Sequence, residues 1–202
     1  MEIEKLKEIW TSLDNRMQQQ EGLKTTIIKE MLLSKSDKAL SRMINWGYFG
    51  LVSILFFTPV LILVYMYAPI YQVATTKLVF VGAFVLIIFI FTIGIIGLIK
   101  LHKIDFSKPV SSNIVMVNKY KVFYKRMTLI ISLFTVIFFV LLFITYFYLP
   151  HMEPWRLIGL FSAISAGFVL GFWEYKRMGM KNINSILRSL EELKELEEPD
   201  YL

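Results

Sequence analysis

The sequence predicts an all-α membrane protein: a four-transmembrane-helix bundle with amphipathic cytoplasmic helices at both termini. Three observations predict this fold. The chain holds four long apolar runs without a charged residue, its lysines and arginines cluster in particular polar segments, and both polar tails space apolar residues at three and four. The chain has 202 residues, 56% of them hydrophobic, and no cysteine. Disulfides and cysteine-based metal sites are therefore excluded.

The apolar runs cover residues 46–67, 78–98, 128–149 and 157–173. Each is close to the roughly 20 residues that a helix needs to cross the apolar core of a bilayer. They predict a four-span bundle at 44–175, between a helical tail at 1–43 and an amphipathic helix at 176–202, with a loop at 99–127 between the second and third spans. Pro59 removes a backbone hydrogen bond within the first span and predicts a kink there. We expect the first span to direct membrane insertion, because the polar start of the chain lacks a cleavable signal pattern.

Positive charge indicates how the spans are oriented. Lysine and arginine concentrate in both tails and in the 99–127 loop, whereas the other two connections hold only Lys77 and Arg156. Because positive residues mark cytoplasmic segments, both termini and this loop are predicted to be cytoplasmic, in a multi-pass protein of the inner (cytoplasmic) membrane. The turns at 68–77 and 150–156 then lie outside. This distribution accounts for the net charge of +6 without direct binding of nucleic acid.

The 99–127 loop is more than a linker. Pro109 followed by Ser111 and Ser112 predicts the start of a helix that continues into the third span. The cytoplasmic stem of that helix carries basic residues among aromatic ones, a composition that suits phospholipid head groups. The predicted contacts to membrane lipids are Lys119, Lys121, Lys125 and Arg126.

Small residues recur at steps of four in the fourth span: Gly159, Ala163, Gly167 and Gly171. This spacing places them on one helix face, where a second helix can approach closely. Two interpretations remain open, packing within the monomer and contact between copies in a homo-oligomer.

Both tails carry an apolar stripe. In the N-terminal tail the stripe is weakened at Gln18–Gly22, resumes at Leu23, Ile27 and Met31, and ends at a turn predicted at Ser34–Asp37. Because helices this short are marginal in water, each stripe needs an apolar partner. The partner is the other tail, the same tail of a second copy, or another protein. Trp10 favours a protein interface, since large aromatics are common anchors. The predicted protein-binding residues are Leu6, Trp10, Leu13 and Met17 in the N-terminal tail and Ile186, Leu190 and Leu193 in the C-terminal helix.

Chemistry-bearing patterns are absent from the sequence. There is no metalloprotease histidine pair, phosphate loop or nucleophile elbow, and no ionisable residue lies within a span. We therefore expect neither an enzyme nor an ion-coupled transporter, and no cofactor. His102 and Asp105 are close enough in sequence to pair, but we expect both to be solvated.

Several tracts resemble a known kind of protein. They are KIDFSK at 103–108, NKYK at 118–121, SLEELKELEE at 189–198, and the opening with Leu6, Trp10 and Leu13 followed by IIKEM at 27–31. Together they resemble small bacterial four-span membrane proteins encoded beside extracytoplasmic-function sigma factors. The resemblance implies a membrane-bound anti-sigma role, in which a cytoplasmic helical tail holds the sigma factor. The chain lacks the zinc-binding His/Cys pattern of better-known anti-sigma proteins, and its predicted outer turns are short.

Two functions are therefore carried forward. The first is a regulatory interaction protein that binds a sigma factor or another cytoplasmic protein through its helices. The second is a structural or lipid-associated oligomer. A small-solute channel or carrier is a third alternative. The N-terminal stripe discriminates between the first two, because burial against the C-terminal helix of the same chain would remove the binding surface.

Overall fold

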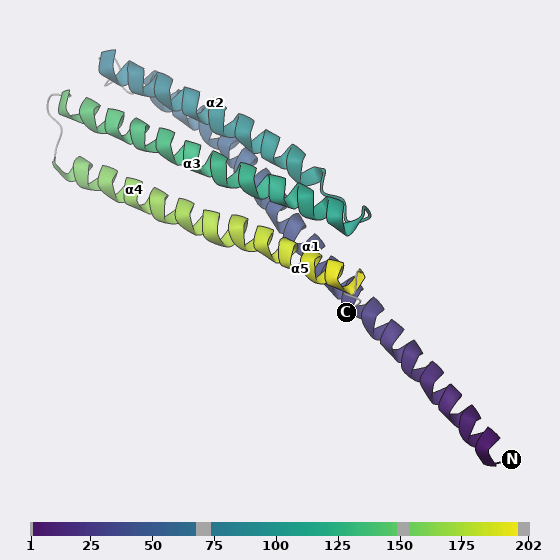
Figure 1. The fold of residues 1–202 in the computed structure, drawn as a ribbon. Coiled ribbons are helices and arrows are strands. Elements are labelled where there is room, and N and C mark those ends of the chain that lie inside the picture. Colours follow the sequence, from purple (N-terminus) through teal and green to yellow (C-terminus); the bar gives the residue numbers. More distant parts are fainter. Residues whose placement is uncertain (1, 68–73, 149–153, 198–202) are drawn as a thin grey trace.

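The computed structural model describes residues 2–67, 74–148 and 154–197, and some side chains within these helices, Leu6 and Ala163 among them, lie outside the description. The elements are α1 (Glu2–Tyr67), α2 (Ala74–His102), α3 (Val110–Tyr148), α4 (Pro154–Trp173), the π-helix η2 (Glu174–Met180) and α5 (Lys181–Glu197). Figure 1 shows them side by side, except for the N-terminal part of α1. The all-α prediction is confirmed for the described residues. Within the described residues, three helices, α1, α2 and α3, are long and apolar enough to cross a membrane, as in a multi-pass membrane protein.

Helix α1 joins the predicted tail and first span into one helix of 66 residues, roughly 100 Å long at 1.5 Å per residue. The turn predicted at Ser34–Asp37 is therefore wrong, and the helix also continues through Gln18–Gly22 and Pro59. Packing explains the missing turn. Ser36 is fully buried and Ala39 is nearly so, and tertiary contacts of this kind outweigh weak local propensities.

The hydrophobic core lies at the polar end of the helices, where segments that look separate in the sequence meet. We call it the junction core. It contains Leu32, Ala39, Leu40 and Met43 of α1, Leu98 and Leu101 of α2, Ile104, Val117 and Tyr120 of the next turn and α3, and Ile183, Ile186, Leu187, Leu190 and Leu193 of α5. Both predicted tails and the 99–127 segment thus share one core.

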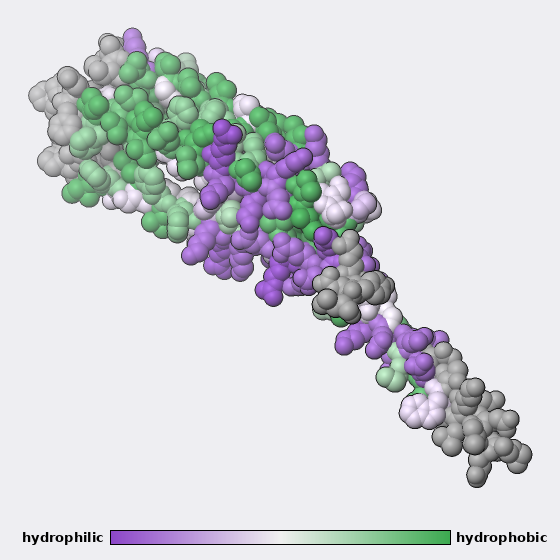
Figure 2. All heavy atoms as spheres, in the orientation of Figure 1, coloured by the Kyte–Doolittle hydropathy of each residue, from purple (hydrophilic) through white to green (hydrophobic). Residues whose placement is uncertain are grey.

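Apolar side chains outside the junction core cover the opposite end of the molecule. Figure 2 shows hydrophobic residues over the end away from the N-terminus and a hydrophilic band around the junction. Val52, Leu55 and Phe56 of α1 and Leu133 of α3 are among the large exposed apolar residues there. Side chains of this kind are stable when lipid rather than water surrounds them.

The connection between α2 and α3 is short and tied by hydrogen bonds. Asp105 accepts hydrogen bonds from the Ser107 amide at 3.0 Å and from the Ser107 hydroxyl, and these bonds lower the pKa of the Asp105 carboxyl. The Asn113 side-chain amide donates to the Lys108 carbonyl oxygen at 3.2 Å. Helix α3 begins at Val110, so the helix start predicted here is confirmed, as is its continuation into the third span.

The predicted spans at 46–67, 78–98 and 128–149 fall in α1, α2 and α3. The predicted span at 157–173 falls on α4, which is a helix but is not one of the three long apolar helices. Ring contacts connect α4 to α3, with centroids 6.0 Å apart for Phe139–Phe168 and for Phe143–Phe161. Most of the two predicted outer turns lies outside the described residues.

Helix α4 continues into α5 through the wider turns of η2. Gly179 is buried there, and a Cβ at this position would overlap the ring of Tyr124 on α3. The Tyr124 ring is stacked on Tyr175, with centroids 5.8 Å and planes 6° apart, so it has little room to move. Close approach of η2 to α3 therefore requires glycine at 179. π-Helical turns are rare in proteins and mostly occur as single turns within α-helices.

We expect Leu190→Ala to lower the free energy of unfolding by about 2–5 kcal/mol, because it leaves a cavity in a core position. Leu190 is 1% exposed in the junction core. The exposed neighbour Glu191 supplies the control, and Glu191→Ala should change stability by less than about 0.5 kcal/mol. Thermal unfolding of the purified protein in detergent measures both. Equal effects of the two substitutions would contradict the position of the core.

A pair of glycine substitutions tests the contact at η2. Gly179→Ala should destabilise the protein by about 1–3 kcal/mol, because the new methyl group overpacks Tyr124. Gly22→Ala meets no atom within 4 Å and should stabilise α1 by about 0.5–1 kcal/mol through helix propensity. The same thermal unfolding assay applies, and stabilisation by both substitutions would overturn the packing at Gly179.

Candidate functional site

Residues 2–26 of α1, which we call the arm, extend beyond the junction core (Figure 1). Contacts to the rest of the chain begin at Ile28, which packs against the core, and at Lys29, whose ammonium lies 3.0 Å from a Glu197 carboxylate oxygen. The arm is roughly 40 Å long at 1.5 Å per residue. Among the residues that the structure describes, most of its length has no tertiary partner.

The N-terminal binding residues predicted from the sequence lie on this arm. Trp10 is 68% exposed, Met17 is 59% exposed and Leu13 is 50% exposed. The Leu6 side chain lies outside the described residues. Apolar side chains aligned on an otherwise polar helix are typical of a binding surface. The arm therefore presents the stripe that the sequence predicts.

The C-terminal residues assigned to protein binding need correction. Ile186, Leu190 and Leu193 are each 1% exposed and pack inside the junction core, so they do not offer a surface to a separate partner. Of the three partners considered for this stripe, the structure shows the other tail of the same chain, because α5 lies against α1. The assignment failed because periodicity reveals an apolar face but not what covers it.

Helix α5 contacts the middle of α1 and not the arm. The covered part of α1 runs from Ile28 to Met43, and the Trp10 stripe lies outside it. Burial against the C-terminal helix of the same chain would have removed the N-terminal binding surface, and the described residues of the stripe are not buried in this way. The apolar stripe of the C-terminal helix is therefore covered within the chain, whereas the described residues of the N-terminal stripe are exposed.

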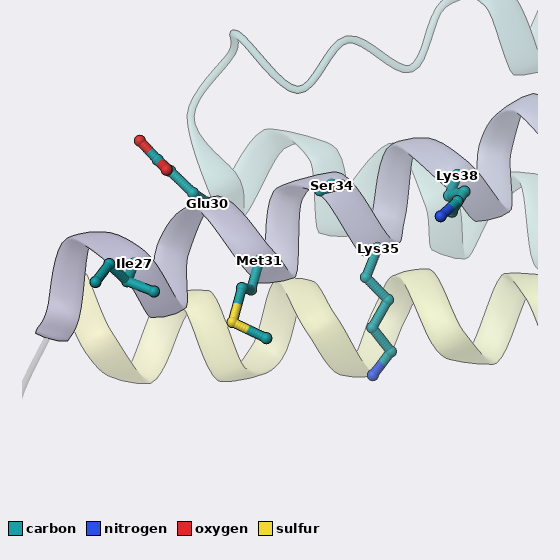
Figure 3. A pocket seen from close by; sticks show the side chains of 6 residues that line it. All are labelled: Ile27, Glu30, Met31, Ser34, Lys35 and Lys38. Carbon is teal, nitrogen blue, oxygen red and sulfur yellow. The ribbon is translucent and has the colours of Figure 1, made fainter.

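An open groove continues the exposed stripe toward the junction core. Its volume is about 510 Å³, and the lining residues that the structure describes belong to α1: Ile27, Glu30, Met31, Ser34, Lys35 and Lys38. Figure 3 shows the Met31 and Lys35 side chains on the same side of the helix, whereas Glu30 points away from them. Ile27 and Met31 are exposed, so the groove has an apolar floor with charged edges.

The predicted lipid-binding residues lie on the stem of α3, between the junction core and the predicted third span. Lys119, Lys125 and Arg126 are exposed, and Lys121 is half-buried. Two neighbouring cations rest on aromatic rings. The Lys100 ammonium is 4.5 Å from the Phe123 ring centroid, and the Arg177 guanidinium is 5.7 Å from that of Trp173. Positive charge therefore surrounds the level where the polar and apolar parts of the molecule meet.

Two polar contacts at the same level were not predicted. The Trp46 indole N–H donates to Glu174 Oε1 at 2.8 Å and ties α1 to η2. His102 Nδ1 lies 3.0 Å from the Leu98 carbonyl oxygen, and its Nε2 lies 3.5 Å from the Tyr48 hydroxyl. The hydrogen bonds of Asp105 run instead to Ser107. The structure thus brings His102 to Tyr48.

Among the described residues, no helix packs on the three glycines of the small-residue stripe of α4. A Cβ at Gly159, Gly167 or Gly171 would meet no atom within 4 Å, and the Ala163 side chain lies outside the described residues. Packing within the monomer is therefore not seen at these three glycines among the described residues. Contact between copies stays a prediction for this face.

Sequence reasoning missed the contact of Gly179 with Tyr124. A lone glycine in an otherwise helical segment was the available signal, but nothing in the spacing points to a tyrosine on α3. The exposed arm, the adjoining groove and the basic stem of α3 remain as candidate functional surfaces. Comparison of the chain with models of protein families, with curated proteins and with solved structures finds no match, so the function must be argued from these residues.

Proposed function

We propose that this protein is an integral membrane interaction protein that presents a protein-binding helix, the arm, to the cytoplasm. The observation that carries the proposal is the exposed Trp10–Leu13–Met17 stripe on a helix that extends roughly 40 Å beyond the junction core. Ordering such a stripe in water without a partner is unfavourable, because its apolar area stays hydrated. A bound protein removes that area from water.

Four spans with both termini cytoplasmic form part of the proposal, in the inner membrane. The contact of α5 with α1 supports this topology. Helices α4, η2 and α5 follow one another without a break, so the chain returns along α4 to the junction core, to which the middle of α1 contributes. Because α4 leads the chain back to the junction core from the opposite end of the molecule, we propose it as the fourth membrane crossing. The basic residues around the junction support a cytoplasmic orientation.

Membrane lipids are the proposed ligands of the basic stem. Lys119, Lys125 and Arg126 lie just before the predicted third span, and their exposed charges are placed for anionic head groups. Such contacts would hold the junction core against the bilayer surface. The arm would then project from that surface into the cytoplasm.

An anti-sigma-like role is the form of this proposal that the sequence resemblance implies. The partner would be a sigma factor or another cytoplasmic regulator of transcription, held by the arm at the membrane. The burial of α5 confines this role to the N-terminal stripe. A structural role in an oligomer is the second candidate, and the charged residues of α1 on both sides of the exposed stripe favour it.

Topology can be measured directly. We expect a reporter that works only in the cytoplasm to be active when fused after Leu202, because the basic residues around the junction core stay on that side. Fusions inserted between residues 68 and 77 should report the outer side. An external reporter signal at Leu202 would remove the arm from the cytoplasm and overturn the proposed function.

Trp10→Ala tests the arm as a binding element. Loss of a buried aromatic anchor costs roughly 2 kcal/mol of binding, about 30-fold in affinity. Crosslinked affinity purification from membranes should therefore recover the partner with the unchanged chain and lose it with Trp10→Ala. Gln19→Ala, an exposed change on the same arm, is the control and should retain the partner.

Under the anti-sigma-like form, Trp10→Ala also raises transcription of the genes that the partner controls, with membrane insertion unchanged. Recovery of the same bound proteins with Trp10→Ala as with Gln19→Ala would contradict the proposed function.

A further inference from the structure

The exposed face of α1 has a heptad repeat that begins in the arm and continues into the groove. With Trp10 at position a, the a positions are Trp10, Met17, Lys24, Met31 and Lys38, and the d positions are Leu13, Gln20, Ile27 and Ser34. All of these side chains are exposed. The core residues of α1, such as Leu32, Ser36 and Leu40, occupy positions b, f and c. Helix α5 thus covers one side of α1 and leaves the a and d positions free.

Charges on both sides of this face are complementary when two copies of the helix run parallel without stagger. In a parallel pair of identical helices, each g residue lies beside the e residue five positions later on the partner helix. Arg16 at g meets Glu21 at e, Glu30 meets Lys35, and Asp37 meets Arg42. Each of these six side chains is exposed in the monomer. Leu23 at g meets Ile28 at e, so the remaining pair in this stretch is apolar.

We infer that a second copy of this chain occupies the face, forming a parallel, two-stranded coiled coil with zero stagger from Trp10 to Lys38. The inference rests on the proposal that the arm binds a protein, and it names that protein. Membrane anchorage supports the geometry, because two copies inserted in one bilayer have arms that run in the same direction from the same depth. In parallel alignment without stagger, the flanking e and g charges match.

The groove fits this occupant. Its described lining residues occupy positions a, d, e and g: Ile27 and Ser34 at d, Met31 and Lys38 at a, Glu30 at g and Lys35 at e. These are the positions that contact the partner helix in a coiled coil. Polar residues within the repeat, Gln20, Lys24, Ser34 and Lys38, lower the stability of a coiled coil, and a lysine at an a position such as Lys24 also specifies register and oligomer state. The six lining side chains, shown in Figure 3, therefore form the C-terminal part of one copy's contribution to the proposed interface.

Disulfide trapping tests the inference in the intact protein, since the native chain contains no cysteine. Three consecutive glutamines provide a matched series: Gln18 at b, Gln19 at c and Gln20 at d. Single variants Q18C, Q19C and Q20C are oxidised in native membranes and resolved as monomer or dimer. Only the d position brings the two copies within the Cα separation of roughly 4.4–6.8 Å that a disulfide needs.

We expect dimer from Q20C and at least about tenfold less from Q18C and Q19C. Equal trapping of all three would indicate random collision, and no trapping of Q20C would indicate arms that stay apart. Either result would overturn the inference.

A charge exchange adds a test of direction and register. In the Q20C background, Arg16→Glu places two acidic residues beside each other across the dimer, and trapping should fall by about three- to fivefold. Glu21→Arg should do the same. The double exchange restores opposite charges and should restore trapping. Because residues five apart in one helix do not face each other, rescue identifies a contact between copies.

The outcomes for this inference and for the proposed function separate. A partner protein that is lost with Trp10→Ala, together with Q20C that remains monomeric, would keep the function and reject the second copy. Trapping at Q20C with no other protein bound to the arm would support the second copy and remove the anti-sigma-like form.

Discussion

Packing of α5 against α1 is the contact on which the polar end of this protein depends. Ile183, Ile186, Leu190 and Leu193 place almost their whole apolar surface in the junction core. A helix as short as α5 is marginal in water, so it is stable because α1 and α3 cover it. Ser36 and Ser189 are fully buried in the same region, and neither hydroxyl has a hydrogen-bond partner among the described residues. Small side chains at these positions let the helices approach closely.

The same contact determines what is left for function. Because α5 uses the b, c and f positions of α1, the a and d positions face away from the junction core. The anchoring of α5 also depends on η2, where Gly179 admits Tyr124 and where Glu174 accepts a hydrogen bond from Trp46. These contacts connect α1, α3 and the end of α4 at one level. The arm therefore extends from a part of α1 that is held in place by packing against α5 and η2.

A second copy and a cytoplasmic partner would bury the same side chains of the arm, so the two would compete. In a membrane, the local concentration of copies is high, since anchored helices share one depth and one direction. Competition of this kind would make the number of free arms depend on the density of the protein. Regulation and assembly, which look like separate functions in the sequence, then become two states of one surface.

The amino-acid sequence by itself determined the helical class, the positions of the long apolar segments and the polar character of both tails. Hydrophobic periodicity and span length are local properties, so residues 46–67, 78–98 and 128–149 could be assigned before any contact was known. It also located both apolar stripes and the small-residue face of α4.

Only the tertiary structure decided how these faces are used. It joined the tail and first span into one helix across Ser34–Asp37, buried Leu190, and left Trp10 and Gly167 exposed. The physical reason is that an apolar stripe of given spacing has the same local signature whether its partner lies in the same chain, in another copy or in the bilayer. Coverage is a property of contacts between segments distant in the chain, and periodicity does not encode it.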